Sequence, residues 1–452
     1  MGRKLFGTDG IRGEANAGAM TVETAVAIGR AVGTIFDSRH ERTRVLIGKD
    51  TRRSCYLFEM ALTAGACSVG AEPYLLGPLP TPGIAFMTTG MRADVGVVIS
   101  ASHNPFQDNG IKLFGADGYK LPDEVEARIE AFMLDDEALA NSICHGADIG
   151  RAYRIEDARG RFIVYLKTTF PSHLTLDGVK IALDCANGAG YRVAPAVFEE
   201  LGATVVTRGV SPNGVNINDG AGALYPEKLA ELVLQQGCDI GIALDGDADR
   251  LIIVDEKGNV IDGDQILALC ATRMQRAGML AHNTLVVTVM SNFGLEAAMR
   301  EAGIRLVRTQ VGDRYVVEAM RKGGFSLGGE QSGHLLFLDH STTGDGILSA
   351  LQVLAIAVQE EATISELMTV MSKAPQELIN IKVSSKPPLH TLPDVQRVIV
   401  HAEKELEGTG RVLVRYSGTE KKCRVMVEGH DARDVDKWSA AIATAVREAI
   451  GA

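Results

Sequence analysis

The chain has 452 residues, of which 46% are hydrophobic and 23% are charged, and its formal net charge at pH 7 is −11. This composition excludes a disordered or fibrous chain, and the length predicts about three domains, or four if they are small. Because the net charge is negative and no basic tract offsets it, nucleic acid is not an expected partner.

The first part of the chain, residues 1–153, alternates between helical and strand patterns and is expected to form an α/β domain. Residues 6–13 (FGTDGIRG) hold three glycines and are expected to be a loop that presents Arg12. The elements that follow are helix 21–36, strand 45–47, a helix that Ser54 caps and that runs to about residue 67, strand 73–76, a further helix and strand 95–99.

The same alternation recurs in residues 154–256 and again in residues 257–372, which predicts two more α/β domains. In the second domain we expect strands at 179–184, near 205 and at 240–244, and helices from 193 and at 226–236. Its glycine cluster at 187–190 is not a dinucleotide-binding fingerprint, because Val193 stands where the third glycine is required. In the third domain we expect strands 285–289 and 304–307 and helices 266–274, 295–302, 314–320 and 343–359.

In the last part, residues 373–452, the α/β alternation ends, residues 384–393 are rich in proline, and the segment has the order strand, helix, strand, strand, helix. This order predicts a smaller α+β domain. The fold class is therefore α/β, with three consecutive α/β domains that have mixed sheets and a C-terminal α+β domain.

The seven cysteines are scattered and form no C-x-x-C pair, which disfavours a zinc site or a disulfide framework. Residues 348–358 form the most sustained apolar stretch, which is far shorter than the roughly 20 residues needed to span a bilayer. Residues 1–6 contain no apolar signal region. We expect a cytoplasmic protein with no membrane partner.

Ser102 follows the apolar run 95–99 and precedes Asn104 and Pro105, so it lies just beyond the end of a buried strand. Ligands bind at this edge of open α/β sheets, which makes Ser102 a candidate nucleophile or phosphate carrier. A serine that caps a turn is the alternative. His103 and Lys112 flank the same loop and are candidates for stabilising a phosphate or moving a proton.

Asp245, Asp247 and Asp249 place three carboxylates within five residues, separated by Gly246 and Ala248. These carboxylates repel one another unless a cation lies among them, and ligation by oxygen alone favours Mg²⁺. A solvated acidic turn is the alternative. An EF-hand is rejected because Arg250 occupies the position that requires glycine, and because the flanking residues are typical of strands.

Two further loops carry polar groups suited to a sugar phosphate. Arg415, Ser417, Gly418 and Thr419 follow a strand, with Arg424 on the next one, and together offer the parts of an anion-binding nest. Glu330 and Ser332 lie in a glycine-rich loop that His334 closes, and they supply an acceptor and a donor for sugar hydroxyls.

These four loops, in their order along the chain, resemble the α-D-phosphohexomutase superfamily over essentially the whole chain. The motifs at residues 6–13, 100–105 and 329–334 are similar to those of its bacterial phosphoglucosamine mutase branch, in which Gln331 is typical where other branches usually have methionine. The resemblance implies four domains around a central cleft. Two positions depart from the family pattern. Lys421 follows the Ser-Gly-Thr-Glu run where proline is usual, and residues 221–225 have alanine and tyrosine where the family usually has cysteine and histidine.

The resemblance also implies a role for each candidate residue. Ser102 would carry the phosphate and bind Mg²⁺ together with the three aspartates. Arg12, His103 and Lys112 would surround the transferring phosphoryl group, Arg250 would lie beside the metal, and His334 would move a proton. Glu330 and Ser332 would contact sugar hydroxyls. The residues that would hold the second phosphate are Arg415, Ser417, Gly418, Thr419 and Arg424.

The reaction that the resemblance implies interconverts glucosamine 6-phosphate and glucosamine 1-phosphate through a bound glucosamine 1,6-bisphosphate, with one Mg²⁺ per chain. The expected partner is this small sugar phosphate, and the chain is expected to be a monomer or a homodimer. The alternatives are a phosphomannomutase or phosphoglucomutase of the same fold, a metal-dependent phosphatase, and a silent sensor of sugar phosphates.

Overall fold

The computed structural model describes residues 5–7, 9–36, 40–417 and 421–452. It divides into two compact units, which are described separately. The first unit contains residues 1–289 and 304–369, and the second contains residues 290–303 and 370–452. In the described part of the chain no single helix has the length and apolar composition to cross a membrane, although two helical segments, Gly346–Glu360 and Ile364–Val370, meet both criteria together across a 97° bend.

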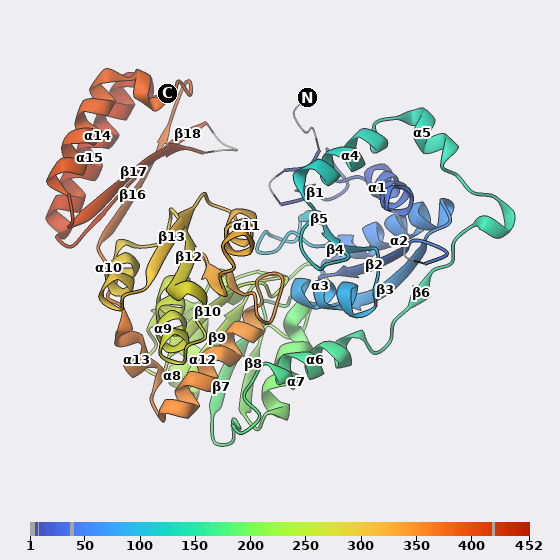
Figure 1. The fold of residues 1–452 in the computed structure, drawn as a ribbon, viewed down its shortest axis with the longest axis horizontal. Helices are drawn as coiled ribbons and strands as arrows, with labels where there is room; N and C mark the ends of the chain where they lie inside the picture. The colour runs from blue at the N-terminus through green and yellow to red at the C-terminus, as the bar shows by residue number, and fades with distance from the viewer. Residues whose placement is uncertain (1–4, 8, 37–39, 418–420) are drawn as a thin grey trace. The chain divides into compact units, whose positions relative to one another are not determined.

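The N-terminal sheet of the first unit is mixed and has the strand order β1-β5-β4-β2-β3-β6 (Figure 1). The strands β4, β2, β3 and β6 run parallel, and β5 is antiparallel to both β4 and β1. The strand bounds are β1 Ile11–Glu14, β2 Arg44–Lys49, β3 Glu72–Pro78, β4 Val95–Ile99, β5 Asp108–Gly115 and β6 Tyr153–Arg154.

Helices cover both faces of this sheet, because successive strand residues point to opposite sides. Val45 and Ile47 share a core with α1 and α2, whereas a side chain at Gly48 would collide with Ile84 of α3. The helix bounds are α1 Val22–Ile35, α2 Arg53–Ser68, α3 Thr81–Gly90, α4 Asp123–Met133, α5 Asp136–Asn141 and α6 Ala158–Thr168. The predicted cap by Ser54 is wrong, because α2 already begins at Arg53 and the Ser54 hydroxyl accepts a 2.8 Å hydrogen bond from Asn109.

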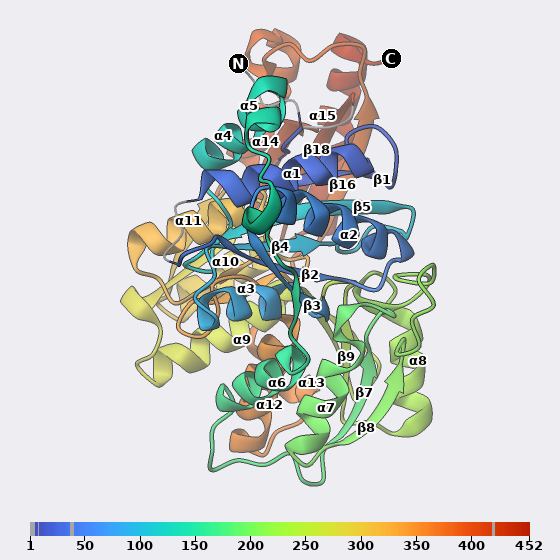
Figure 2. The same ribbon diagram turned by 90° about the vertical axis from the view of Figure 1, so that its right-hand side faces the viewer.

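The second sheet has the order β11-β10-β9-β7-β8. Its strands β9, β7 and β8, which are labelled in Figure 2, are parallel, and β10 is antiparallel to both β9 and β11. Its strands are β7 Lys180–Asp184, β8 Thr204–Arg208, β9 Ile240–Leu244, β10 Leu251–Asp255 and β11 Val260–Ile261, and its helices are α7 Val193–Glu200 and α8 Glu227–Gln236. Every residue of β9 and β10 is buried, which is why both read as continuous apolar runs.

The third sheet has the order β13-β12-β14-β15, with β15 antiparallel at one edge. Its strands are β12 Thr284–Thr288, β13 Arg305–Thr309, β14 Leu327–Gly329 and β15 Leu335–Phe337. The helices of this part of the first unit are α9 Gly263–Arg276, α11 Asp313–Gly323, α12 Gly346–Glu360 and α13 Ile364–Leu367.

The second unit contains an antiparallel sheet of order β16-β18-β17. Its strands are β16 Gln376–Lys382, β17 Gly410–Tyr416 and β18 Lys422–Gly429, and its helices are α10 Phe293–Glu301, α14 Pro393–Glu405 and α15 Ala432–Ile450. The helices α14 and α15 pack on the sheet around a core that includes Trp438. The predicted order of strand, helix, strand, strand, helix is confirmed, and so is the fold class of mixed α/β sheets followed by a small C-terminal sheet.

Candidate active site

Ser102 lies in the loop between β4 and β5, three residues beyond the end of β4. Its backbone is left-handed, with φ of +51°, and its side chain is 2% exposed. A left-handed conformation is uncommon for a residue other than glycine, so the surroundings must hold this one. The Ser102 amide donates a 3.0 Å hydrogen bond to the Ser100 hydroxyl, which tightens the turn.

The three aspartates lie in the loop between the antiparallel strands β9 and β10 of the second sheet. Ala248, in the middle of the loop, has a φ of +58°, which bends the chain so that the carboxylates converge. One carboxylate oxygen from each aspartate lies within 4.8 Å of the others, and all three side chains are buried.

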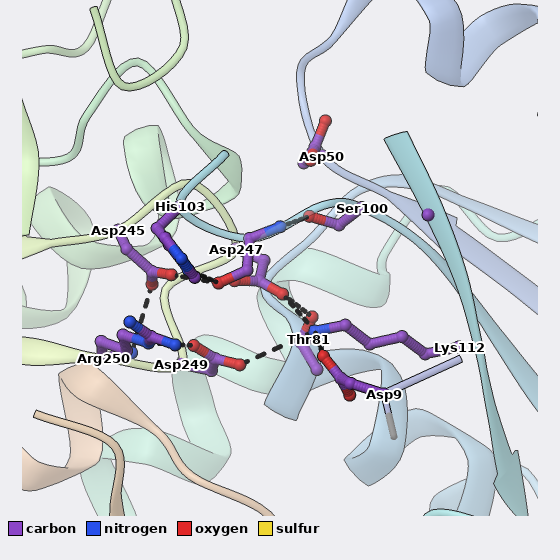
Figure 3. A network of polar contacts seen from close by, with 12 residues as sticks. Asp9, Asp50, Thr81, Ser100, His103, Lys112, Asp245, Asp247, Asp249 and Arg250 are labelled. Carbon is purple, nitrogen blue, oxygen red and sulfur yellow. Dashed lines mark hydrogen bonds and ion pairs between the residues drawn. The ribbon is translucent and has the colours of Figure 1, made fainter. Parts of the chain in front are cut away.

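The structure brings these two loops into direct contact, although they belong to different sheets (Figure 3). The Ser102 hydroxyl donates a 2.6 Å hydrogen bond to Asp245. Thr81, at the start of α3, donates its hydroxyl to Asp247 at 2.8 Å and its amide to the Asp247 carbonyl at 3.0 Å. The predicted meeting of the serine with the aspartates is therefore present in the fold.

Two observations indicate that the aspartate loop fits a divalent cation. Oδ1 of Asp247 and Oδ1 of Asp249 are buried and have no hydrogen-bond partner among the described residues. Burial, together with the neighbouring carboxylates of Asp249 and Asp247, holds the pKa of Asp245 well above its usual value. A cation bound among the three carboxylates would remove this repulsion and would be ligated by the two oxygens that accept no hydrogen bond.

Lys112 supplies positive charge to the same cluster from β5. Its ammonium group lies 3.0 Å from Asp247, 3.8 Å from Asp249 and 3.6 Å from Asp9. Burial alone would lower the pKa of Lys112, but the carboxylates, Asp247 and Asp9 foremost, raise it above its usual value. Lys112 therefore stays charged and links the first sheet to the aspartate loop.

Arg12 lies on β1, paired in register with Gly110 of β5, and forms an ion pair with Asp9. The prediction of a loop over residues 6–13 is thus partly wrong. Residues 11–14 form an edge strand, because β5 offers them backbone hydrogen-bond partners. The strand fixes the backbone of Arg12 while its side chain remains part exposed.

His103 contacts the serine hydroxyl, with Nδ1 3.3 Å from Ser102 Oγ. Burial and the nearby guanidinium groups of Arg250 and Arg12 lower the pKa of His103 to about 4. His103 is therefore neutral at neutral pH and can accept a proton.

Arg250 lies beside the aspartates. Its backbone amide donates a 3.2 Å hydrogen bond to Asp245, and its side chain lies 4.0 Å from Asp249.

His334 has the opposite charge state because it lies between two carboxylates. Nδ1 is 3.6 Å from Asp249, and Nε2 is 3.6 Å from Asp313 at the start of α11. Burial disfavours the charged ring, but Asp249 and Asp313 outweigh it and raise the pKa of His334 to about 9. His334 is therefore protonated at neutral pH and can give up a proton.

Glu330 and Ser332 lie in the turn between β14 and β15. The turn is attached to the second sheet, because the Leu251 amide donates to the Gly333 carbonyl at 2.9 Å. Glu330 is part exposed and accepts a 3.1 Å hydrogen bond from the Gly312 amide, and Ser332 is exposed. Both side chains are thus available to a ligand.

The predicted phosphate-binding residues 415–424 belong to the second unit. Arg415 and Arg424 face each other in register on β17 and β18. Burial and the charge of Arg424 lower the pKa of Arg415, so this pair of cations would gain from a bound anion. Ser417 is buried, and its amide donates to the Lys422 carbonyl at 2.9 Å. Gly418 and Thr419 lie outside the described residues.

Several residues of the site were not predicted from the sequence. Lys120 lies 2.5 Å from both Asp9 and Asp313, and so joins the N-terminal motif to the carboxylate beside His334. Asp9 lies inside a glycine-rich motif, and Asp313 follows a predicted strand and a glycine, so the sequence gives a weak indication that each belongs to a site. Thr81 and Lys120 carried none.

Comparison with known families identifies all four parts of the chain. The matching descriptions are phosphoglucomutase/phosphomannomutase alpha/beta/alpha domain I for residues 3–140, domain II for 161–258, domain III for 262–374 and the C-terminal domain for 378–445. These domains match the order of the sheets described above. The boundaries predicted at residues 153, 256 and 372 stay predictions.

The chain is similar throughout to curated bacterial enzymes. It is 57% identical to the phosphoglucosamine mutase of Citrifermentans bemidjiense over 449 residues, 99% of each chain, and 57% identical to that of Syntrophotalea carbinolica over 453 residues, 100% of this chain and 99% of the relative. Similarity at this level covers all four loops of the site.

Solved structures share the fold at lower identity. A phosphoglucomutase/phosphomannomutase family protein of Burkholderia thailandensis has a TM-score of 0.80 at 22% identity, covering 98% of this chain and 97% of the other. An N-acetylphosphoglucosamine mutase of Aspergillus fumigatus, solved in complex with GlcNAc-6P and magnesium, has a TM-score of 0.67 at 18% identity, covering 99% of this chain and 96% of the other. The chain belongs to the phosphoglucosamine mutase family of the phosphohexomutases, which are isomerases.

Proposed function

We propose that this protein interconverts glucosamine 6-phosphate and glucosamine 1-phosphate, with phosphoserine at position 102 as the phosphate donor. The observation that carries the proposal is the 2.6 Å hydrogen bond between Ser102 and Asp245. It places the oxygen that would carry the phosphate beside a cluster of carboxylates that fits a divalent cation. The product would feed the synthesis of UDP-N-acetylglucosamine and of cell-wall precursors.

In the first transfer the bond between phosphorus and Ser102 Oγ breaks, and a bond forms to the 1-hydroxyl of glucosamine 6-phosphate. The hydroxyl proton leaves, Oγ regains a proton, and glucosamine 1,6-bisphosphate remains bound. After this intermediate turns over, its 6-phosphate passes to Ser102 and glucosamine 1-phosphate is released. The two transfers balance, so the enzyme ends as phosphoserine.

The donor set favours Mg²⁺ as the cation, because three carboxylates and a serine-borne oxygen are hard ligands and neither His nor Cys takes part. Asp245, Asp247, Asp249 and the Ser102 oxygen would hold it. When bound, it would neutralise charge on the transferring phosphoryl group. Lys112 and Arg12 stabilise the same charge from the first sheet.

The remaining residues divide between proton movement and binding of the sugar. Neutral His103 and protonated His334 are the groups that can accept and give the hydroxyl proton. Glu330, Ser332 and Arg250 would contact the sugar and its phosphates. Arg415, Ser417, Gly418, Thr419 and Arg424 would hold the phosphate that is not reacting.

The proposed partner is the sugar phosphate alone, and the proposed compartment is the cytoplasm. All seven cysteines are free, which fits a reducing compartment. A monomer or a homodimer is proposed.

The test is an assay with glucosamine 1-phosphate and glucosamine 6-phosphate for the native chain and for Ser102→Ala, together with the intact mass of both. We expect turnover by the native chain, about 80 Da of added mass on it, and a rate loss of at least about 1,000-fold for Ser102→Ala. Faster turnover of glucose or mannose phosphates would favour the alternative within the fold. Release of free phosphate would indicate a phosphatase, and binding without phosphate on Ser102 would indicate a sensor.

A further inference from the structure

Two side chains from different parts of the chain converge on the backbone carbonyl oxygens of the serine loop. Arg52, at the start of α2, donates from Nη2 to the Ser102 carbonyl at 3.1 Å and to the Asn104 carbonyl at 2.6 Å. Asn218, in the second domain's sequence, donates from Nδ2 to the same two carbonyls, both at 2.9 Å. Neither side chain contacts Ser102 Oγ in the described hydrogen bonds.

Both donors are rigidly placed. Arg52 has no exposed surface, and its guanidinium forms an ion pair with Asp50, which also accepts the Arg52 amide at 2.8 Å. Asn218 is 6% exposed and has a φ of +58°, and its backbone amide donates a 2.9 Å hydrogen bond to the Ala186 carbonyl. Arg52 is anchored to the first sheet and Asn218 to the second.

The aspartate loop packs against the same carbonyl. A Cβ on Gly246, between Asp245 and Asp247, would lie 2.5 Å from the Ser102 oxygen. The Ser102 carbonyl is thus held by Arg52 and Asn218 and crowded by Gly246. These contacts hold the left-handed backbone of Ser102, and that backbone directs the hydroxyl toward Asp245.

We propose that Arg52 and Asn218 are positioning residues that clamp the serine loop by its carbonyl oxygens and so hold Ser102 Oγ at the metal-binding loop. The inference rests on the proposed function, because the clamp serves transfer of a phosphate carried by Ser102. Its effect is on the geometry of transfer and not on binding of the sugar, since neither residue belongs to the loops that would contact the sugar.

The test uses Asn218→Asp, which keeps the shape and the tolerance for a left-handed backbone but turns the donor toward the carbonyls into an acceptor. Asn216→Asp is the matched control, because it makes the same change in the same loop where the amide donates only to Ser211. Asn218→Gly removes the donor without adding repulsion. For each full-length variant we would measure kcat, KM and the melting temperature, and the deuterium exchange of the amides at 102 and 104.

For Asn218→Asp we expect kcat to fall by about tenfold or more, KM to stay within about twofold, and the two amides to exchange about tenfold faster. Asn218→Gly should show a smaller loss and Asn216→Asp none. Native exchange and native kcat in Asn218→Asp would overturn the proposal, and so would a rise in KM with kcat unchanged. If the native chain does not turn over glucosamine phosphate, the proposed function fails, while the exchange comparison still decides whether Asn218 clamps the loop.

Discussion

Ser102 donates a 2.6 Å hydrogen bond to Asp245, a residue 143 positions further along the chain. The bond joins the loop after β4 of the first sheet to the loop after β9 of the second. Each loop by itself is a turn with polar side chains. Their contact produces a buried group of oxygens in which a carboxylate, a hydroxyl and a divalent cation can act together.

The carboxylates of the aspartate loop repel one another when no metal is bound. Burial and the neighbouring carboxylates hold the pKa of Asp245 well above its usual value, so Asp245→Asn relieves repulsion when no metal is present. We expect its melting temperature in a chelating buffer to equal or exceed that of the native chain. Addition of Mg²⁺ should raise the melting temperature of the native chain but not that of the variant. A variant that melts well below the native chain in the chelator would contradict this account of the loop.

Thr81 fixes the orientation of Asp247 through its hydroxyl, which leaves Oδ1 free to bind a cation. Thr81→Val removes that hydrogen bond with almost no change of shape. We expect the Mg²⁺ concentration for half-maximal activity to rise by about 10- to 100-fold, as for other partners of metal ligands. The control is Thr89→Val on the same helix, whose hydroxyl donates only to the Phe86 carbonyl. If the two variants require the same Mg²⁺ concentration, the Thr81 hydroxyl does not orient Asp247 for metal binding.

The pH dependence of stability should report His334. Its pKa is raised from 6.5 to about 9, because the neighbouring carboxylates outweigh burial. A raised folded-state pKa adds stability that is full below pH 6.5 and is lost as the pH rises through about 9. The contribution is on the order of 3 kcal/mol.

The measurement is the free energy of unfolding in urea, without metal, from pH 6 to pH 10. The native chain should lose stability between pH 6.5 and 9, and His334→Gln should show a much flatter curve there. His173→Gln, which changes an exposed histidine, should follow the native curve. Parallel curves for the native chain and His334→Gln would show that the imidazole does not carry this charge.

The facing arginines of the second unit should determine the affinity for the sugar phosphate. Arg415→Ala removes a charge-assisted hydrogen-bond donor, each of which contributes about 1.5–3 kcal/mol. We therefore expect KM to rise by about 10- to 100-fold with a smaller change in kcat. Arg433→Ala, on the surface of the same unit, is the control and should leave KM unchanged. If the KM of Arg415→Ala equals that of the native chain, Arg415 does not bind the phosphate that is not reacting.

The sequence indicates the reactive residues of this site more completely than the residues that hold them in position. Ser102 and the aspartates are recognisable because each follows an apolar run and carries functional groups at close spacing. Thr81, Lys120 and Asn218 are not recognisable, because each acts only through a contact with a residue more than 100 positions away. Arg12 was misplaced for a related reason: its glycine-rich segment becomes a strand only because β5 lies alongside it.

The bond between Ser102 and Asp245 also sets an order of events during translation. At about 5–20 residues per second, the ribosome needs roughly 7–30 s to make the segment between the two residues. Throughout that interval the nascent polypeptide contains the serine loop but not yet the aspartate loop with which it would transfer phosphate. Competence for phosphate chemistry therefore cannot arise before the second sheet has been made and has docked on the first.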